Sequence, residues 1–213
     1  MKLFSTAYFP NVAYMAQMAT CQAAAIEAWE TYPKQTYRNR AIIATANGTL
    51  PLTANVERPS GNHTITKYIT ICYRENWPMQ HWRAIESAYN ASPYFLYYSD
   101  DVKNLIFSHK HFLIDLNMDI LQWCLKKTNL KTAIDTTTDF AKPCGDEHDL
   151  RYAISPKVPC QWQFEEYPQV FDTRLGFAPN LSVLDLLFNL GPESGEYLKR
   201  QTHFKQLTLN TKR

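Results

Sequence analysis

Three basic residues stand close together near the N-terminus, at Lys34, Arg38 and Arg40. On an extended strand they would share one face, because strand side chains alternate. Like charges on one face repel each other unless an anion lies between them, and the guanidinium fork matches phosphate and carboxylate groups. The stretch therefore predicts a site for an anionic ligand. The alternative is a solvated face paired with nearby acids such as Glu27 or Glu30.

A histidine among large rings is the second candidate. His81 lies one helical turn after Trp77 and directly before Trp82. An imidazole titrates near neutrality, so a histidine held between rings could act as a general acid or base. The alternative is a structural histidine whose ring packs on tryptophan.

A third group of polar residues lies near the C-terminus, at Asn180, Ser182 and Asp185. Asp185 could orient a histidine or bind a hydroxyl group. The Ser-x-x-Asp spacing also resembles a capping box, which explains Ser182 and Asp185 but leaves Asn180 without a role.

The cysteines and histidines give weaker signals. Cys144, His148 and Cys160, with His109 and His111 upstream, are permissible zinc ligands, but their spacing matches no standard module, so no metal is expected. The five cysteines are odd in number and include no Cys-x-x-Cys pair, which indicates reduced thiols in a cytoplasmic protein.

The composition argues against several classes of function. The chain has 22 basic and 20 acidic residues and no long block of like charge, so we expect no nucleic-acid partner. No apolar stretch reaches the roughly 18 residues of a membrane helix, so no membrane insertion is expected. The 6 glycines form neither a Walker loop nor a dinucleotide fingerprint, and no cofactor is predicted.

The elements that would position these candidates follow from periodicity and turn residues. A strand over residues 2–9, a helix from Val12 and a strand over residues 22–29 form a β-α-β unit, whose crevice at the strand ends commonly binds ligands. Residues 36–56 read as a hairpin with a type I′ turn at Asn47-Gly48.

The remainder of the chain is predicted to be mostly helical. The expected fold is a single α/β domain over residues 1–204, with a mixed sheet, the β-α-β unit, the hairpin, a helical C-terminal half and a polar tail over residues 205–213. Further expected elements are a strand over 67–73, a helix capped by Asn76, helices over 100–108, 111–128 and 182–190, a strand over 132–138, and a loop over 141–165.

Several blocks of the sequence together resemble the WbqC-like protein family. They run in order from residue 3 to residue 200. The blocks are Tyr8-Phe9-Pro10 with Tyr14, Tyr32-Pro33-Lys34-Gln35-Thr36-Tyr37-Arg38-Asn39-Arg40, Asn76-Trp77, His81-Trp82-Arg83-Ala84-Ile85-Glu86-Ser87-Ala88-Tyr89, Ser92-Pro93-Tyr94-Phe95, Tyr167-Pro168-Gln169-Val170-Phe171, and Pro179-Asn180-Leu181-Ser182-Val183-Leu184-Asp185-Leu186-Leu187-Phe188-Asn189 followed by Gly191-Pro192.

The resemblance implies a role in surface-polysaccharide synthesis of the O-antigen type. The leading hypothesis is an enzyme that transfers an acyl, aminoacyl or glycosyl group onto a sugar or nucleotide-linked sugar. The alternative is a non-catalytic protein that binds a sugar nucleotide or a partner enzyme of the pathway, and a homodimer is a further possibility. Many family members carry a His-Gln-Pro motif after the first strand, whereas this chain has Tyr8-Phe9-Pro10, so a catalytic base at that position would be missing.

The resemblance also extends the set of candidate site residues. It favours the anion-binding role of the basic stretch over the solvated face. The predicted catalytic residues are His81 and Asp185, and the predicted substrate-binding residues are Tyr8, Tyr14, Lys34, Arg38, Asn39, Arg40, Trp77, Tyr167, Gln169, Asn180 and Asn189.

Overall fold

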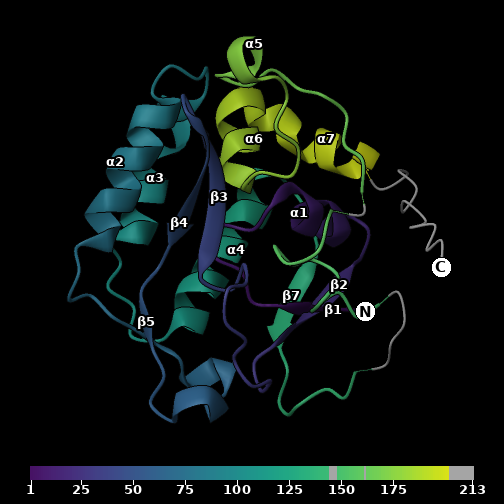
Figure 1. The fold of residues 1–213 in the computed structure, drawn as a ribbon. Helices are drawn as coiled ribbons and strands as arrows, with labels where there is room; N and C mark the ends of the chain where they lie inside the picture. Colours follow the sequence, from purple (N-terminus) through teal and green to yellow (C-terminus); the bar gives the residue numbers. More distant parts are fainter. Residues whose placement is uncertain (144–147, 161, 202–213) are drawn as a thin grey trace, which may run out of the picture.

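The computed structural model describes residues 1–143, 148–160 and 162–201 (Figure 1). The predicted domain end at residue 204 and the tail over 205–213 lie outside the described residues. Among the described residues, no helix is both long enough and apolar enough to cross a bilayer.

A three-stranded parallel sheet contains the N-terminal β-α-β unit. Its strands are β1 (Lys2–Ser5), β2 (Ala23–Glu27) and β7 (Ala133–Thr136), in the order β1-β2-β7, and α1 (Val12–Ala19) connects the first two. The predicted unit is confirmed. β1 is shorter than predicted because the chain leaves the sheet after Ser5 and turns at Phe9, whose φ is 39°.

Two asparagines fix the start of α1. Asn11 is the N-cap, and its Oδ1 accepts a hydrogen bond from the backbone of Tyr14 at 2.9 Å. Asn180, far away in sequence, accepts through Oδ1 from the backbone of Ala13 at 2.9 Å. Side-chain acceptors of this kind satisfy the free N–H groups of a first helical turn. The start of α1 therefore joins the N-terminal and C-terminal parts of the chain.

The predicted hairpin is present as β3 (Arg40–Thr45) and β4 (Gly48–Thr53), which pair with each other in a separate two-stranded sheet. The predicted type I′ turn is wrong. That turn needs a positive φ at both central residues, whereas neither Ala46 nor Asn47 has one and Gly48 has a φ of 110°. Gly48 alone adopts the backbone conformation that glycine tolerates best.

Residues 34–39 form a turn rather than the extended strand that the spacing of basic residues suggested. Gln35 has a φ of 56°, which reverses the chain before β3 begins at Arg40. The predicted strand over 67–73 is also shorter. It consists of the 3-10 turn η2 (Thr66–Tyr68) and the two-residue strand β6 (Thr70–Ile71). β6 pairs with β5 (Val56–Glu57), and the 3-10 turn η1 (Gly61–His63) lies between β5 and η2 in the chain.

The C-terminal half is helical, as predicted. Asn76 makes no side-chain cap, so that detail of the prediction is wrong, while Pro78 lies in the first turn of the helix. The helices are α2 (Trp77–Tyr89), α3 (Phe95–Ile106), α4 (Leu113–Lys127), α5 (Asp172–Leu175), α6 (Val183–Leu190) and α7 (Ser194–Arg200), with the 3-10 turn η3 (Gly191–Glu193) between the last two.

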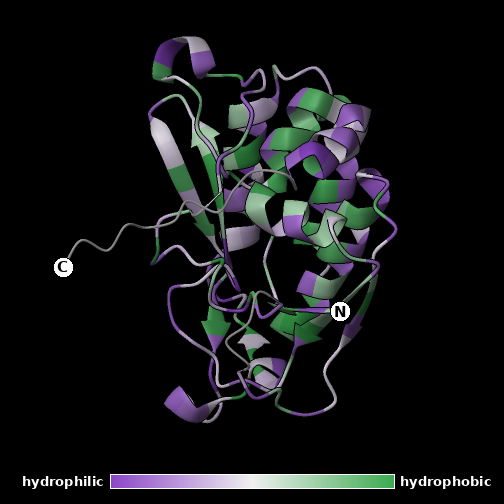
Figure 2. Cartoon of the chain, turned by 90° about the vertical axis from the view of Figure 1, so that its right-hand side faces the viewer, coloured by the Kyte–Doolittle hydropathy of each residue, from purple (hydrophilic) through white to green (hydrophobic). Residues whose placement is uncertain are grey.

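Helix α6 lies at the centre of the core. Leu184, Leu186 and Phe188 are fully buried, and the hairpin strand β3 packs against both α2 and α6 (Figure 1). Along the surrounding helices hydrophobic and hydrophilic residues alternate, as expected when one face packs inward (Figure 2). This packing brings β3, the start of α1 and the turn before α6 to one face of the molecule.

Candidate functional site

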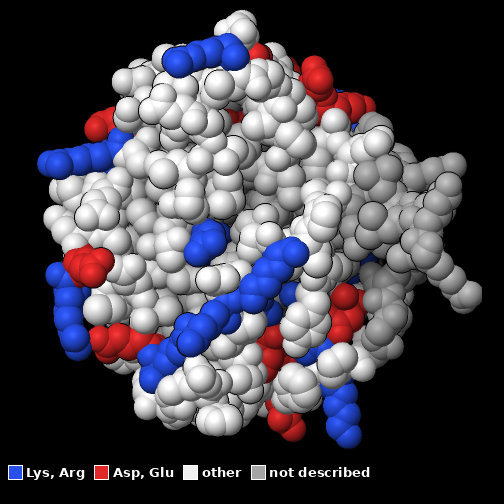
Figure 3. Space-filling view, viewed as in Figure 1, with Lys and Arg blue, Asp and Glu red and all other residues white. Residues whose placement is uncertain are grey.

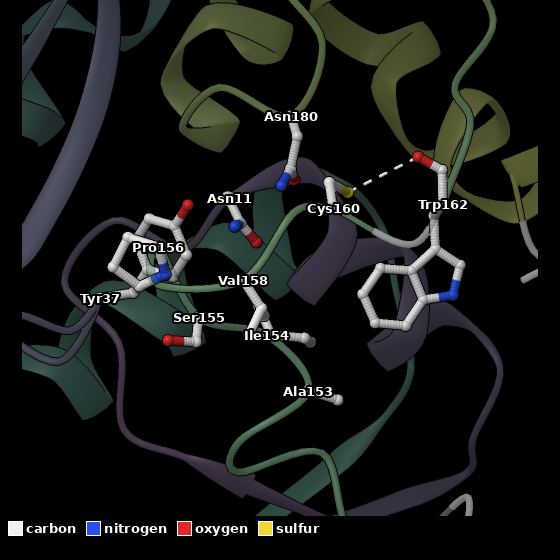
Figure 4. A pocket seen from close by; sticks show the side chains of 10 residues that line it. All are labelled: Asn11, Tyr37, Ala153, Ile154, Ser155, Pro156, Val158, Cys160, Trp162 and Asn180. Atoms are coloured by element: carbon white, nitrogen blue, oxygen red, sulfur yellow. Dashed lines mark hydrogen bonds between the residues drawn. The ribbon is translucent and has the colours of Figure 1, made fainter. Parts of the chain in front are cut away.

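A cavity of about 120 Å³ opens at the start of α1 (Figure 4). Asn11, Tyr37 and Asn180 form one wall, from three segments that are far apart in sequence. The opposite wall is the long segment after β7. Its lining residues are Ala153, Ile154, Ser155, Pro156, Val158, Cys160 and Trp162.

Polar groups of the first wall remain available inside the cavity. The Oδ1 atoms of Asn11 and Asn180 are used by α1, and Asn11 Nδ2 is buried with no partner in hydrogen-bonding geometry. A buried polar atom without a partner is rare in a native protein, and a bound molecule or water commonly satisfies it. The Tyr37 hydroxyl is the neighbouring group that Asn11 can reach, and a hydrogen bond from the Asn11 side chain acts to lower the pKa of Tyr37.

Tyr37 connects the cavity to a basic edge. Burial raises the pKa of the Tyr37 hydroxyl, while the Asn11 amide and the Arg40 charge act in the opposite direction. Arg40 starts β3 and donates through Nε to the Thr53 hydroxyl at 3.3 Å. A positive charge therefore stands next to the polar wall of the cavity.

The second wall contributes two groups of the nucleophile type, the Ser155 hydroxyl and the Cys160 thiol. Cys160 donates through Sγ to the Trp162 carbonyl at 3.5 Å (Figure 4). Burial raises the pKa of the Cys160 thiol, with the hydrogen bond to Trp162 acting the other way. The thiol is thus protonated at neutral pH, and a thiol is a weaker nucleophile than a thiolate.

A buried ionic network anchors this second wall to the end of the parallel sheet. Arg151 donates to Glu27 Oε2 at 2.9 Å and to Asp149 Oδ2 at 2.6 Å, and it also donates to the Ala141 carbonyl. The side chains of Arg151 and Glu27 are fully buried. Because Glu27 is the last residue of β2, this network lies at the C-terminal end of that strand.

Arg38 belongs to a second buried ion pair and not to an open cationic face. Its Nε donates to Glu30 Oε1 at 2.7 Å, and the two side chains are 3% and 2% exposed. Its carbonyl accepts from Asn117 Nδ2, which also donates to the Thr6 hydroxyl. The alternative interpretation was a solvated face paired with acids such as Glu30. Arg38 does pair with Glu30, but the pair is buried and not solvated. Lys34 is exposed in the preceding turn.

His81 lies in a closed cluster away from the cavity. Its Nδ1 lies 3.0 Å from the Tyr8 hydroxyl, and the neighbouring Thr53 backbone acts to raise its pKa. Burial lowers the pKa of His81 to about 4, so the ring is neutral at pH 7. Trp77 packs against both Tyr8 and His81. The geometry favours a connecting role between α2, the hairpin and the N-terminal loop.

Asp185 lies in another closed cluster. Its Oδ2 accepts from the Tyr167 hydroxyl at 2.6 Å and from Gln169 Nε2 at 2.8 Å. Its Oδ1 has no partner in hydrogen-bonding geometry, although the Tyr89 hydroxyl is close enough to lower its pKa. Burial outweighs these donors and raises the pKa of Asp185. The capping-box role is wrong for Asp185, because the hydroxyl of the N-cap, Ser182, accepts from Leu184 and the carboxylate points to Tyr167 and Gln169.

The remaining predicted residues make local contacts. The Tyr14 hydroxyl donates to the Ser5 carbonyl, and Trp77 Nε1 donates to the Cys72 carbonyl. Asn39 Nδ2 donates to the Ala54 carbonyl and closes the hairpin, while Asn189 Nδ2 donates to the Asp185 carbonyl one turn earlier. Of the predicted set, Asn180 alone lines the cavity, and Arg40 lies beside it.

Sequence reasoning missed most of the cavity lining. Tyr37 stood inside a family-like block without being chosen, and Asn11 was not among the predicted site residues. Ser155, Cys160 and Trp162 belong to the predicted loop over 141–165, and loops of more than about 15 residues inside a domain are often functional. That length was the available signal. The described residues contain no group of three or more potential metal ligands, and Cys144 lies outside them.

A family model described as "WbqC-like protein family" matches residues 6–159. The chain belongs to the WbqC-like protein family. The match includes Asn11, Tyr37 and Ser155 of the cavity, and it ends before Cys160 and Asn180.

The chain is similar to the "Uncharacterized protein Rv1507c" of Mycobacterium tuberculosis (strain ATCC 25618 / H37Rv). It is 25% identical over 197 residues, which cover 79% of this WbqC-like chain and 84% of the relative. No solved structure matches the chain.

Proposed function

We propose that this WbqC-like protein binds a sugar or nucleotide-linked sugar of surface-polysaccharide synthesis in the cavity at the start of α1. The observation that carries the proposal is the convergence of Asn11, Tyr37 and Asn180 on one cavity, where Asn11 Nδ2 has no partner other than the neighbouring Tyr37 hydroxyl. Amide and hydroxyl groups on an aromatic-lined wall are suited to the hydroxyl groups of a sugar.

The size of the cavity limits what it can hold. Ligand pockets commonly measure about 300–1,000 Å³, and this cavity measures about 120 Å³. We therefore infer that it takes one part of the ligand, such as a single sugar ring, and that the rest lies over the neighbouring surface.

Binding without turnover is favoured over group transfer by the location of the titratable residues. His81 and Asp185 lie in buried clusters outside the cavity, and among the described residues the cavity lining includes no histidine and no carboxylate. General acid–base catalysis needs such a group within hydrogen-bond reach of the reacting proton. The described cavity wall offers amides, hydroxyls and a thiol in its place.

A thermal-shift screen of the purified protein tests the proposal. The ligands are free sugars, sugar phosphates and nucleotide-linked sugars. A ligand at a hundred times its Kd adds about 2.7 kcal/mol of stability when it binds only the folded state. The variant Ser155→Leu fills the cavity and should lose the shift, whereas Ser87→Leu on the exposed face of α2 should keep it. A shift that survives in Ser155→Leu would place the ligand elsewhere.

Group transfer remains the second candidate because Cys160 and Ser155 face the cavity. In an acyl transfer, the Cys160 sulfur would attack the acyl carbonyl and form a thioester, while the thiol proton would leave with the donor group. An acceptor hydroxyl would then take the acyl group and return a proton to sulfur. Incubation with acetyl-coenzyme A should leave an acetylated Cys160 peptide in the wild type and none in Cys160→Ser. An unmodified peptide would count against this route.

A further inference from the structure

The Tyr32 hydroxyl is buried without a partner. Tyr32 is 5% exposed, and its Oη has no hydrogen-bond partner. A buried hydroxyl without a hydrogen bond is unfavourable by several kcal/mol in an apolar environment. Its backbone is fixed, because its N–H donates to the Thr64 carbonyl. The hydroxyl is therefore held in one place with its donor capacity unused.

One guanidinium group lies over the Tyr32 ring, and the charges of two more act on its hydroxyl. The Arg58 guanidinium carbon lies 5.5 Å from the centre of the Tyr32 ring. Burial raises the pKa of Tyr32, and the charges of Arg38, Arg58 and Arg40 all act to lower it, so the positive field converges at the hydroxyl. Figure 3 shows Lys and Arg side chains gathered across the middle of this face.

The charge of this cluster is incompletely balanced. Glu30 pairs with Arg38, whose charge is thereby compensated. Within the described ranges, neither Arg40 nor Arg58 takes part in an ion pair with a carboxylate. Arg40 uses only one of its five N–H donors, toward the Thr53 hydroxyl. Near Tyr32, two guanidinium groups thus have free donors and no carboxylate partner among the described residues, and the Tyr32 hydroxyl has no partner.

We propose that Arg40, Arg58 and the Tyr32 hydroxyl form an anion site for the phosphate or diphosphate group of the ligand. The guanidinium fork matches two phosphate oxygens at once, and the hydroxyl supplies a further donor. The site differs from the one that the sequence suggested, since Arg38 is replaced in it by Arg58 and Lys34 is not required. It rests on the proposed function, because it assigns the part of the ligand that the cavity is too small to hold.

Arg40 connects this site to the cavity. Its charge acts on Tyr32 on one side and on Tyr37, a cavity wall residue, on the other. A ligand whose sugar ring occupies the cavity would therefore place an attached phosphate against Arg40. This arrangement indicates a sugar phosphate or nucleotide-linked sugar, and it disfavours an uncharged sugar.

Isothermal titration of the full chain with inorganic diphosphate at low salt tests the site without the sugar. Arg40→Met and Arg58→Met should each raise the Kd by about tenfold, as expected for the loss of a charge-assisted hydrogen bond. Tyr32→Phe should raise it by a smaller factor. Arg83→Met, which removes the same charge from an exposed position of α2, should change it less than twofold. Thermal unfolding of each variant confirms that it folds.

The outcomes separate this site from the cavity. Diphosphate that binds to Ser155→Leu as it does to the wild type supports an anion site distinct from the cavity. No binding of diphosphate to the wild type, or equal losses in Arg83→Met and Arg58→Met, overturns the anion site. In either of those cases, loss of sugar binding in Ser155→Leu would still support the proposed function.

Discussion

The two kinds of polar region in this molecule differ in whether they border an open cavity. In the clusters around His81 and Asp185, the imidazole and the carboxylate engage neighbouring donors and acceptors, and both side chains are buried. Around the α1 cavity and the Arg40 edge, an amide, a hydroxyl and two guanidinium groups have unused donors.

This difference shows why residue type alone is a poor guide to a site. Histidine and aspartate are common catalytic residues, yet buried polar networks also fix one arrangement of a core. Unused capacity in a preformed cavity is the more specific signal for a ligand. The following predictions test whether the first region is structural and the second is functional.

The largest effect should come from the ionic network below the cavity wall. Arg151→Met leaves the buried carboxylates of Glu27 and Asp149 without their partner, and breaking such a pair from one side typically destabilises a protein by about 3–5 kcal/mol. Urea unfolding at pH 7 measures the loss. The double variant with Glu27→Gln should recover part of it. A loss below 1 kcal/mol would show that the wall is not anchored there.

The His81 cluster should respond to pH. Its pKa is near 4 in the folded state and near 6.5 when unfolded, so the unfolded state binds more protons between these values. The stability contributed by neutral His81 is fully present above pH 6.5 and is lost as pH falls toward 4, by about 2 kcal/mol between pH 7 and pH 5. Urea unfolding of His81→Gln, whose amide does not titrate, should lack this component. An identical pH dependence in both proteins would contradict the buried neutral ring.

The Asp185 cluster should show the opposite sign. Burial raises the pKa of its carboxyl, so its favourable contribution is complete below the unfolded pKa and is lost as pH rises through the folded value. Asp185→Asn keeps the shape without the buried charge, and at pH 7 its free energy of unfolding should equal or exceed that of the wild type. A clear destabilisation at pH 7 would mean that the carboxylate is stabilised more strongly by its donors than by water.

The smallest effect should be that of a single hydroxyl in the cavity. Tyr37→Phe keeps the ring and should weaken ligand binding by about 1 kcal/mol, the net contribution of one hydrogen bond. Its unfolding free energy should stay close to that of the wild type. Calorimetry with the ligand that gives the largest thermal shift measures the affinity, and an unchanged Kd would remove Tyr37 from the site.

The sequence predicted the elements with strong local signals. The β-α-β unit, the hairpin and most helices follow from periodicity, and α6 ends at Leu190 as predicted, with Gly191 at a positive φ. The turn over 34–39 could not be foreseen, because alternation over so few residues does not distinguish a strand from a turn stabilised by tertiary contacts such as Arg38 with Glu30.

The cavity itself depends on long-range packing. Asn180 meets α1 across 167 positions of sequence, and the wall from Ala153 to Trp162 has no periodicity that would fix its path. The family-like blocks located two of its residues, Tyr37 and Asn180, without showing that they converge.

The central claim is that ligand binding depends on the α1 cavity and not on the Asp185 cluster. The most direct test compares Ser155→Leu with Asp185→Asn in calorimetric titrations with nucleotide-linked sugars. The account predicts that Ser155→Leu loses binding while Asp185→Asn retains the Kd of the wild type within twofold. Retained binding in Ser155→Leu together with lost binding in a folded Asp185→Asn would contradict it.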